Sequence, residues 1–336
     1  MTDAMLTVGS LTLYKSALVI ALGAAACFAL TASLHASHGG LTAATGLFSL
    51  VDILLTVLFC RFLHYYCHAE QYRSFFRALT DYSVGGYVIA GALPAAVAAA
   101  WITQLAGFTQ NRRRLLDCFA PGAVLAFALI RLSALFNSTC RGKIIVRTPL
   151  LQHLPLASPV TTSSGAAEYH FATFFVEFLM LAAVFWAVLR FFFKARRRPM
   201  KASQPRDGNV ALFALLLCAA TELLFDSTRY DSSFLHFNGF VSLGQMAAAL
   251  SLLGVLVIWS VRSVRANGRT AFHWMIWIGW FFSLAVTGLS EYFVQRHGDW
   301  YLGCYAVMAV GCFFMARLPY RMYRSILAKK KRAASH

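Results

Sequence analysis

Nine apolar segments of about 20 residues alternate with shorter polar connections along the chain. A helix of that length crosses the hydrocarbon core of a membrane, and only helices or closed barrels satisfy their backbone groups in lipid. We therefore predict an all-α fold, a polytopic transmembrane helical bundle of about nine spans. The expected spans are 11–34, 44–66, 83–106, 114–137, 169–193, 208–228, 239–262, 271–293 and 300–319.

Basic residues follow alternate spans, and this alternation predicts the orientation. They gather in 112–114, 194–201, 262–269 and 321–332, which fall on one side if every span crosses once. Positive charge in short loops marks the cytoplasmic side, so we expect the N-terminus outside and the C-terminus in the cytoplasm.

Composition agrees with a membrane protein. Of the 336 residues, 59% are hydrophobic and 13% are charged, whereas soluble domains carry about 25% charged residues. The net charge is +17, and the basic residues lie mostly in segments between the apolar runs. We interpret them as signals that set the membrane orientation and as contacts with anionic head groups, not as a nucleic-acid site. The eight cysteines contain no CxxC pair, so no metal site is predicted, while a disulfide on one side stays open.

Arg131 lies inside the apolar run 124–136. A cation at membrane depth costs roughly 2.5–3.5 kcal/mol on insertion scales, so a partner or an anionic ligand is expected there. Two interpretations stay open, a structural ion pair with a carboxylate on another helix and a ligand-binding role. We predict that Glu177 or Glu222 lies within salt-bridge reach of Arg131 or Arg61, and that both arginines face an interior cavity.

Many of the ionisable residues are expected at one depth, beneath the outer surface. They include Arg61, His64, Arg131, Glu168, His170, Glu177, Glu222, Asp226 and Arg229. One interpretation is ordinary interfacial polarity, with Arg61 extending toward the head groups. The other is a cavity for an anionic phospholipid head group, because the planar guanidinium matches phosphate oxygens.

Several motifs, in order along the chain, carry a family resemblance. Residues 117–121 (D-C-F-A-P) and 130–143 (I-R-L-S-A-L-F-N-S-T-C-R-G-K) resemble the D-x-(I/F)-A-P and G-R-(I/L)-G-N-F-I-N-G-E-x-x-G-R signature of prolipoprotein diacylglyceryl transferases. The segments 60–65, 83–86 and 241–245 resemble that family's G-R-(I/L)-x-Y, H-G-G and S-M-G-Q, and 6–14 resembles its opening segment.

The resemblance implies a seven-helix transferase-like domain over 1–262, with 263–336 adding two helices and a basic cytoplasmic tail. It implies a bacterial cytoplasmic membrane protein of lipoprotein biosynthesis that uses no cofactor and no metal. The family moves the diacylglyceryl group of phosphatidylglycerol, an anionic phospholipid, onto the lipobox cysteine thiol of a secreted lipoprotein precursor.

The resemblance also implies site residues. The candidate phospholipid-binding residues are Arg61, Gly85, Gly86, Arg131, Asn137, Gly142, Glu222 and Gln245. The candidate catalytic residues are His64, Arg131, His170 and Arg229. His64, His68 or His170 could substitute as the base, because all three are expected on the outer side.

The chain departs from the family at five polar positions. The family's motif His aligns with Val84, its Asn with Ala134, its Glu with Thr139 and its first-helix Tyr with Ser16. Its second essential Arg aligns near Phe225, although Arg229 follows one turn later. A literal H-G-G at 38–40 is expected on the cytoplasmic side, so we interpret it as a coincidence.

These departures keep an alternative open, a non-catalytic phospholipid-binding or partner membrane protein on the same scaffold. A transporter or channel is disfavoured, because no pair of broken helices and no repeated half is evident in the sequence.

Overall fold

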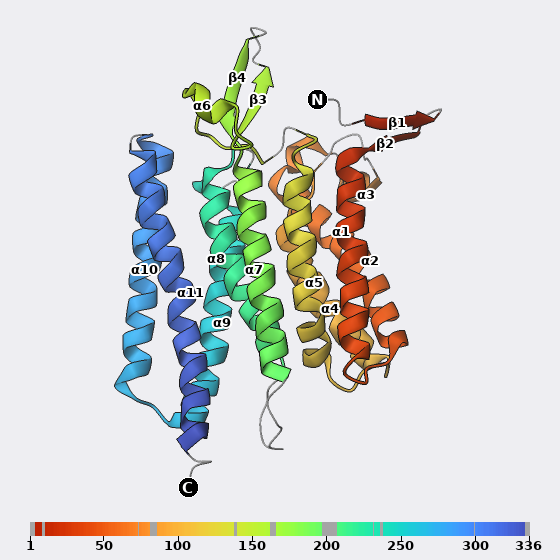
Figure 1. Ribbon diagram of the computed structural model, residues 1–336, viewed down its shortest axis with the longest axis vertical. Coiled ribbons are helices and arrows are strands. Elements are labelled where there is room, and N and C mark those ends of the chain that lie inside the picture. Colours follow the sequence, from red (N-terminus) through yellow and green to blue (C-terminus); the bar gives the residue numbers. More distant parts are fainter. Residues whose placement is uncertain are drawn as a thin grey trace. The chain divides into compact units, whose positions relative to one another are not determined.

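The computed structural model describes residues 4–8, 11–72, 74–80, 86–137, 140–161, 166–196, 207–230, 232–235, 238–298 and 300–332 (Figure 1). The chain forms two compact units, which are described separately. The N-terminal unit comprises Met1–Ala214 and Thr228–Ser233, and the C-terminal unit comprises Leu215–Ser227 and Phe234–His336.

Within the described residues, eight helices are long and apolar enough to cross a membrane. They are α1 (Lys15–Ala36), α2 (Thr42–Cys67), α5 (Arg112–Ser133), α7 (Thr173–Arg196), α8 (Asn209–Thr228), α9 (Leu243–Asn267), α10 (Ala271–Arg296) and α11 (Tyr301–Arg332). The predicted all-α polytopic helical bundle is therefore confirmed.

The expected third span, 83–106, is not one continuous helix. Residues 86–88 are extended, η2 (Ile89–Gly91) is a single 3-10 turn, and α4 (Ala92–Leu105) has 14 residues. At 1.5 Å per residue α4 spans only about 21 Å, against about 30 Å of hydrocarbon. Residues 83–85 lie outside the described part of the chain.

Close packing on α2 explains why this segment is not helical throughout. The Val88 N–H donates to the Cys60 carbonyl at 3.1 Å. A Cβ on Gly91 would lie 2.5 Å from the backbone nitrogen of Cys60, so only glycine allows this approach. Irregular backbone at membrane depth is tolerated where it is buried against protein, as here.

Arg61 on α2 satisfies carbonyl groups of the same irregular region. Its Nε donates to the Ala78 carbonyl at 2.6 Å, and its Nη1 donates to the Gly86 carbonyl at 2.8 Å. The guanidinium also lies near the rings of Tyr72 and Tyr87, with centroids at 5.3 and 5.4 Å. Ala78 belongs to α3 (Phe75–Thr80), which follows the turn η1 (Ala69–Gln71).

Small residues let the helices of the N-terminal unit approach closely. α1 packs against α5, α2 against α4, and α5 against α7. A Cβ on Gly122 of α5 would lie 2.6 Å from the Cys27 carbonyl oxygen of α1. Such small-residue contacts are the usual means of helix association in lipid.

Asp117 of α5 caps the start of α8. Its carboxylate accepts three backbone N–H groups, from Gly208 at 2.8 Å and from Val210 and Ala211 at 2.9 Å each. The first N–H groups of a helix have no partner within the helix, and a buried carboxylate satisfies them well. The acidic position of the D-C-F-A-P motif thus serves the fold.

Short strands lie at the end of the N-terminal unit opposite its basic loops (Figure 1). β1 (Ala4–Val8) pairs with β2 (Leu11–Tyr14), and β3 (Ala157–Thr161) pairs with β4 (Ala167–Phe171), both antiparallel. We call this the strand end, and the other end of the unit the basic end. α6 (Pro149–Gln152) precedes β3.

The strands correct two span boundaries. The first span begins at Lys15 and the fifth at Thr173, because 11–14 and 167–171 pair as strands. His170 therefore lies on β4, not in a helix.

In the C-terminal unit, α11 packs against both α9 and α10. β5 (Phe234–Leu235) pairs with β6 (Asn238–Ser242), which leads into α9. Glu291 of α10 is buried, accepts a hydrogen bond from the Ser227 hydroxyl, and accepts one from Gln295 at 2.7 Å. All eight cysteines belong to the described residues, and no disulfide joins them.

Replacing Asp117 with Ala should destabilise the protein, because three backbone N–H groups at the start of α8 lose a charged acceptor. Hydrogen bonds to charged groups contribute about 1.5–3 kcal/mol each, so a clear drop in the melting temperature in detergent is expected. Asp117→Asn keeps one acceptor oxygen, so its melting temperature should lie between those of the parent protein and Asp117→Ala. Equal melting temperatures for Asp117→Ala and the parent protein would contradict this role.

Candidate functional site

Arg131, Glu177 and Arg229 form a buried ion cluster at the strand end of the N-terminal unit. Glu177 Oε1 lies 2.8 Å from Arg131 Nε and 3.1 Å from Arg229 Nη2. The Glu177 side chain is fully buried, and the two arginine side chains are only 7% and 6% exposed. The prediction that Glu177 reaches one of the arginines is confirmed, and the structural ion pair exists.

The cluster carries more positive than negative charge. Two guanidinium groups share a single carboxylate oxygen, so the three side chains have two formal positive charges and one negative charge. Arg131 comes from the last turn of α5, Glu177 from the beginning of α7, and Arg229 directly follows α8.

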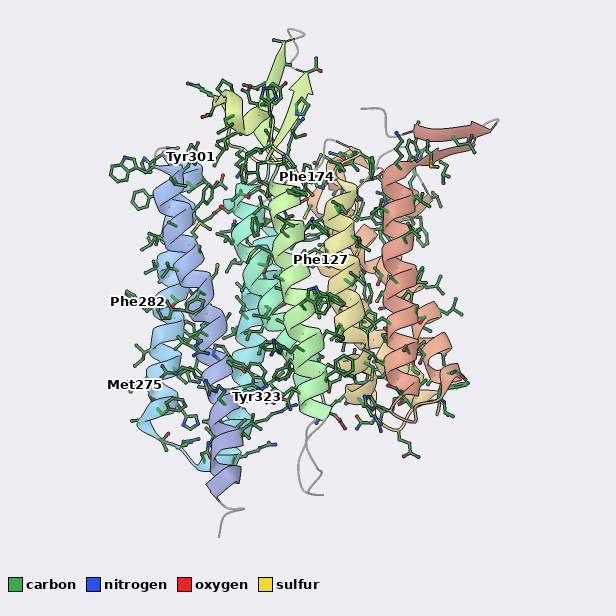
Figure 2. The ribbon with its side chains drawn as sticks, viewed as in Figure 1. Phe127, Phe174, Met275, Phe282, Tyr301 and Tyr323 are labelled. Atoms are coloured by element: carbon green, nitrogen blue, oxygen red, sulfur yellow. The ribbon has the colours of Figure 1, made fainter. Side chains whose placement is uncertain are left out.

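Phe127 and Cys140 border the Arg131 guanidinium. Its Cζ lies 4.9 Å from the Phe127 ring centroid, and its Nη1 lies 3.5 Å from the Cys140 sulfur. Figure 2 shows Phe127 on α5 and Phe174 on the neighbouring α7. The charged group is thus held between an aromatic ring, a thiol and the Glu177 carboxylate.

Backbone pairing fixes the position of Arg229. Gly142 forms an antiparallel bridge with Arg229, the Lys143 N–H donates to the Thr228 carbonyl, and the Tyr230 N–H donates to the Arg141 carbonyl, both at 2.9 Å. The segment after α5 and the segment after α8 therefore cross as a short ladder.

Gly142 leaves no room for a side chain at this crossing. A Cβ there would lie 2.7 Å from Thr173 Oγ1 and 2.8 Å from the Phe171 carbonyl oxygen. The Gly142 N–H donates to that same Phe171 carbonyl at 2.7 Å. Its role in the structure is to let three backbone segments meet beside the ion cluster.

His170 joins the same crossing. Its Nδ1 lies 3.0 Å from the Gly142 carbonyl oxygen, which can only accept, so Nδ1 carries the proton. Its Nε2 lies 3.3 Å from Glu168 Oε2, so a proton taken up at Nε2 would be shared with that carboxylate. The ring thus belongs to a residue of β4 and is hydrogen-bonded to Gly142, which pairs with Arg229.

His64 belongs to the neighbourhood of Arg61. Its Nδ1 lies 3.3 Å from the Tyr72 hydroxyl, and its ring stacks on His68 with centroids 4.5 Å apart. A Cβ on Gly86, where φ is 139°, would lie 2.0 Å from His64 Nε2. His64 thus contacts the last glycine of the 83–86 motif, while Gly85 lies outside the described residues.

The structure gives Gln245 a helix-capping role. Ser242 Oγ accepts the Gln245 N–H at 3.0 Å, and the Gln245 side chain accepts the Ser242 N–H at 3.1 Å, which is a capping box. Ser242 also donates to Asp226, and Gly244 lies against the same carboxylate. The S-x-x-Q spacing, visible in the sequence, could have predicted this cap.

Two other predicted site residues are partly buried. Asn137 is partly buried four residues beyond the end of α5, and Glu222 is partly buried on α8. Phospholipid binding by Asn137, Glu222 and Gln245 stays a prediction, as it does for Arg61, Gly85 and Gly86.

The literal H-G-G at 38–40 lies far from the ion cluster. The His38 carbonyl accepts a hydrogen bond from Arg114, in the first turn of α5, whereas Arg131 is in the last turn. Seventeen residues of helix separate these two arginines by about 26 Å. The segment thus lies at the basic end of the unit, as expected.

Comparison with known protein families identifies the family of this chain. The model of the family described as prolipoprotein diacylglyceryl transferase matches residues 3–261. The chain belongs to this family. No curated protein matches the chain.

Membership gives the function at family level. The protein is a multi-pass membrane protein of the prolipoprotein diacylglyceryl transferase family, with a transferase-like role in lipoprotein biosynthesis and with lipid and lipoprotein substrates. The family match ends near the end of α9, and α10 and α11 lie beyond it.

Glu177→Ala should destabilise the protein strongly, because it leaves two buried guanidinium groups without their shared carboxylate. Removing one partner of a buried ion pair typically costs about 3–5 kcal/mol, which thermal unfolding in detergent would detect as a lower melting temperature. Glu168→Ala, at a carboxylate 37% exposed, is the matched control and should change the melting temperature little. Similar behaviour of the two variants would contradict the structural role of Glu177.

Proposed function

We propose that the chain transfers the diacylglyceryl group of phosphatidylglycerol to the thiol of a lipobox cysteine. The supporting observation is the convergence of Arg131 and Arg229 on one buried carboxylate oxygen at the strand end. The excess positive charge of this cluster suits the phosphodiester of an anionic phospholipid. By the positive-inside rule the strand end faces outward, where a secreted precursor would arrive, in a bacterial cytoplasmic membrane.

The reaction requires one bond to form and one to break. The cysteine sulfur attacks the diacylglycerol carbon that carries the phosphate oxygen, a carbon–sulfur bond forms, and the carbon–oxygen bond breaks. Glycerol phosphate leaves with the bonding electrons, and the thiol proton passes to a base. The thiolate is the competent nucleophile, so nearby positive charge assists the attack.

Arg131 and Arg229 are assigned to the leaving phosphate. Charge on the phosphate oxygens increases as the carbon–oxygen bond breaks, and fixed donors in a site of low dielectric constant stabilise that charge most effectively. Glu177 holds both guanidinium groups from one side and is therefore a positioning residue. Gly142 positions Arg229 through the backbone bridge.

His170 is assigned as the base, since the family's motif histidine is absent here. Its Nε2 can accept a proton while Nδ1 stays bonded to the Gly142 carbonyl, and Glu168 lies beside Nε2 to share that proton. His64 is the second candidate, because it contacts Gly86 of the 83–86 motif. We infer that the transferase domain comprises 1–262, with α10 and α11 in 263–336 as an addition.

One observation favours the alternative, a non-catalytic phospholipid-binding protein. Ala134, which stands at the family's asparagine position, is buried in an apolar cluster with Ala172 and Phe174, against which Cys140 and Phe175 pack. At position 134 an apolar cluster thus stands where the family has a polar side chain. Phospholipid binding by the arginine pair would persist on this alternative, and turnover would not.

Turnover separates the two functions. The purified protein with phosphatidylglycerol and a lipobox peptide should form a diacylglyceryl thioether, detected by mass spectrometry. Arg131→Gln and Arg229→Gln should each lower the rate by about 10²–10³-fold, the usual effect of removing one charge-stabilising donor. Arg265→Gln, an exposed arginine of α9, is the control and should keep the parent rate. Phosphatidylglycerol binding without any thioether would favour the binding protein and contradict the transferase.

His170→Asn should slow transfer to a peptide thiol by about 10²-fold, the lower range for loss of general base catalysis. The loss should diminish as the pH is raised toward the ordinary thiol pKa of about 8.5, because the thiolate then forms without a base. His64→Asn is measured in parallel. A pH-dependent loss in His64→Asn, with a parent-like rate in His170→Asn, would assign the base to His64 instead.

A further inference from the structure

α4 presents an apolar stripe on its exposed face. Leu93, Val97, Trp101 and Leu105 are all exposed and recur every four residues, so they follow one side of the helix. Leu105, at the C-terminal end of the stripe, is 77% exposed. The opposite face is alanine-rich and packs against α2 and α5.

A polar pocket lies next to the end of this stripe. Its volume is about 280 Å³, and it is lined by Gln104, Gln110, Asn111, Arg112, Arg113 and Asp207. All of these residues belong to the N-terminal unit and lie at its basic end. The stripe and the pocket thus place a hydrocarbon surface beside a charged recess.

The pocket holds charges of both signs. The Arg112 guanidinium lies over the Trp101 ring, 3.5 Å from its centroid, and donates to Gln104 Oε1 at 3.0 Å. The aliphatic part of Arg113 lies beside Gly208, the residue after Asp207. Asp207 Oδ2 accepts a hydrogen bond from Asn111 Nδ2 at 2.5 Å, which ties the carboxylate to the start of α5.

The height of the pocket matches the head-group region. Tryptophan prefers the membrane–water interface, where its ring is in hydrocarbon and its polar edge is hydrated. Trp101 is exposed and stacks against a pocket arginine, an arrangement that suits a position at that interface.

We propose that this pocket binds the head group of a zwitterionic aminophospholipid, whose acyl chain lies along the α4 stripe. Arg112 and Arg113 take the phosphate, and Asp207 takes the ammonium group. The ammonium group of such a head group can form a charge-assisted hydrogen bond with Asp207, whereas the glycerol of phosphatidylglycerol offers only neutral hydroxyl donors, so the mixed lining favours a head group with both charges. Free phosphate would leave the stripe unused.

This site is distinct from the proposed transferase site. Arg112 and Arg131 lie at opposite ends of α5, about 28 Å apart along the helix axis. The lipid would occupy the leaflet on the basic side and would stabilise α4, which is too short to span the membrane by itself. Its binding is therefore independent of whether the arginine pair at the strand end turns over substrate.

Native mass spectrometry of the delipidated full-length protein tests the site with three probes, phosphatidylethanolamine, phosphatidylglycerol and inorganic phosphate. The protein should also bind phosphatidylglycerol at the proposed strand-end site, so this pocket is measured by the binding that Arg112→Gln/Arg113→Gln removes. The double variant should weaken phosphatidylethanolamine binding by about tenfold or more, the equivalent of losing charge-assisted hydrogen bonds, and phosphatidylglycerol binding by less. Asp207→Asn, which retains an acceptor for Asn111, should weaken phosphatidylethanolamine binding and leave phosphatidylglycerol binding unchanged. Arg131→Gln and the exposed control Arg265→Gln should leave phosphatidylethanolamine binding unchanged.

Leu105→Gln supplies a variant whose folding is not at risk, because the side chain is exposed. It should weaken phosphatidylethanolamine binding without changing the melting temperature of the lipid-free protein. Unchanged lipid binding in Leu105→Gln and in the double arginine variant would overturn the proposal. So would a loss of phosphatidylglycerol or inorganic phosphate binding in Arg112→Gln/Arg113→Gln as large as the loss of phosphatidylethanolamine binding.

Discussion

The central constraint on this structure is that charge buried at membrane depth must be paired. Glu177 meets this constraint for Arg131 and Arg229 together, through one oxygen shared by both guanidinium groups. Three segments distant in sequence, the end of α5, the start of α7 and the residue after α8, are thereby joined at one point. The same pairing leaves positive charge in excess, and that excess is what a phospholipid phosphate would use.

A second constraint is that backbone polar groups in lipid need partners. Arg61 meets it by donating to the Ala78 carbonyl of α3 and to the Gly86 carbonyl in the broken third span. Asp117 meets it at the start of α8, and Ser242 with Gln245 does so at the start of α9. Several motif residues of the family thus have structural roles.

The sequence predicted the helical class, most of the long apolar helices and the pairing of Glu177 with Arg131, because apolar length and isolated charges are strong signals in membrane proteins. It missed the break before α4, since an apolar run of that length does not reveal the close contact of Gly91 with the backbone of α2. It placed His170 in a helix because the alternation of a short strand such as β4 is hidden beside a long apolar run. The pairing of Arg229 with Gly142 depends on residues far apart in sequence, which composition and spacing cannot bring together.

The most direct test is an experimental map of the protein with phosphatidylglycerol bound. The account predicts phosphate density in contact with the guanidinium groups of both Arg131 and Arg229, with Glu177 still bonded to them and the lipid tails leading out into the membrane. Phosphate density elsewhere, with hydrocarbon side chains closing over the arginine pair and leaving no opening for a lipid, would contradict it.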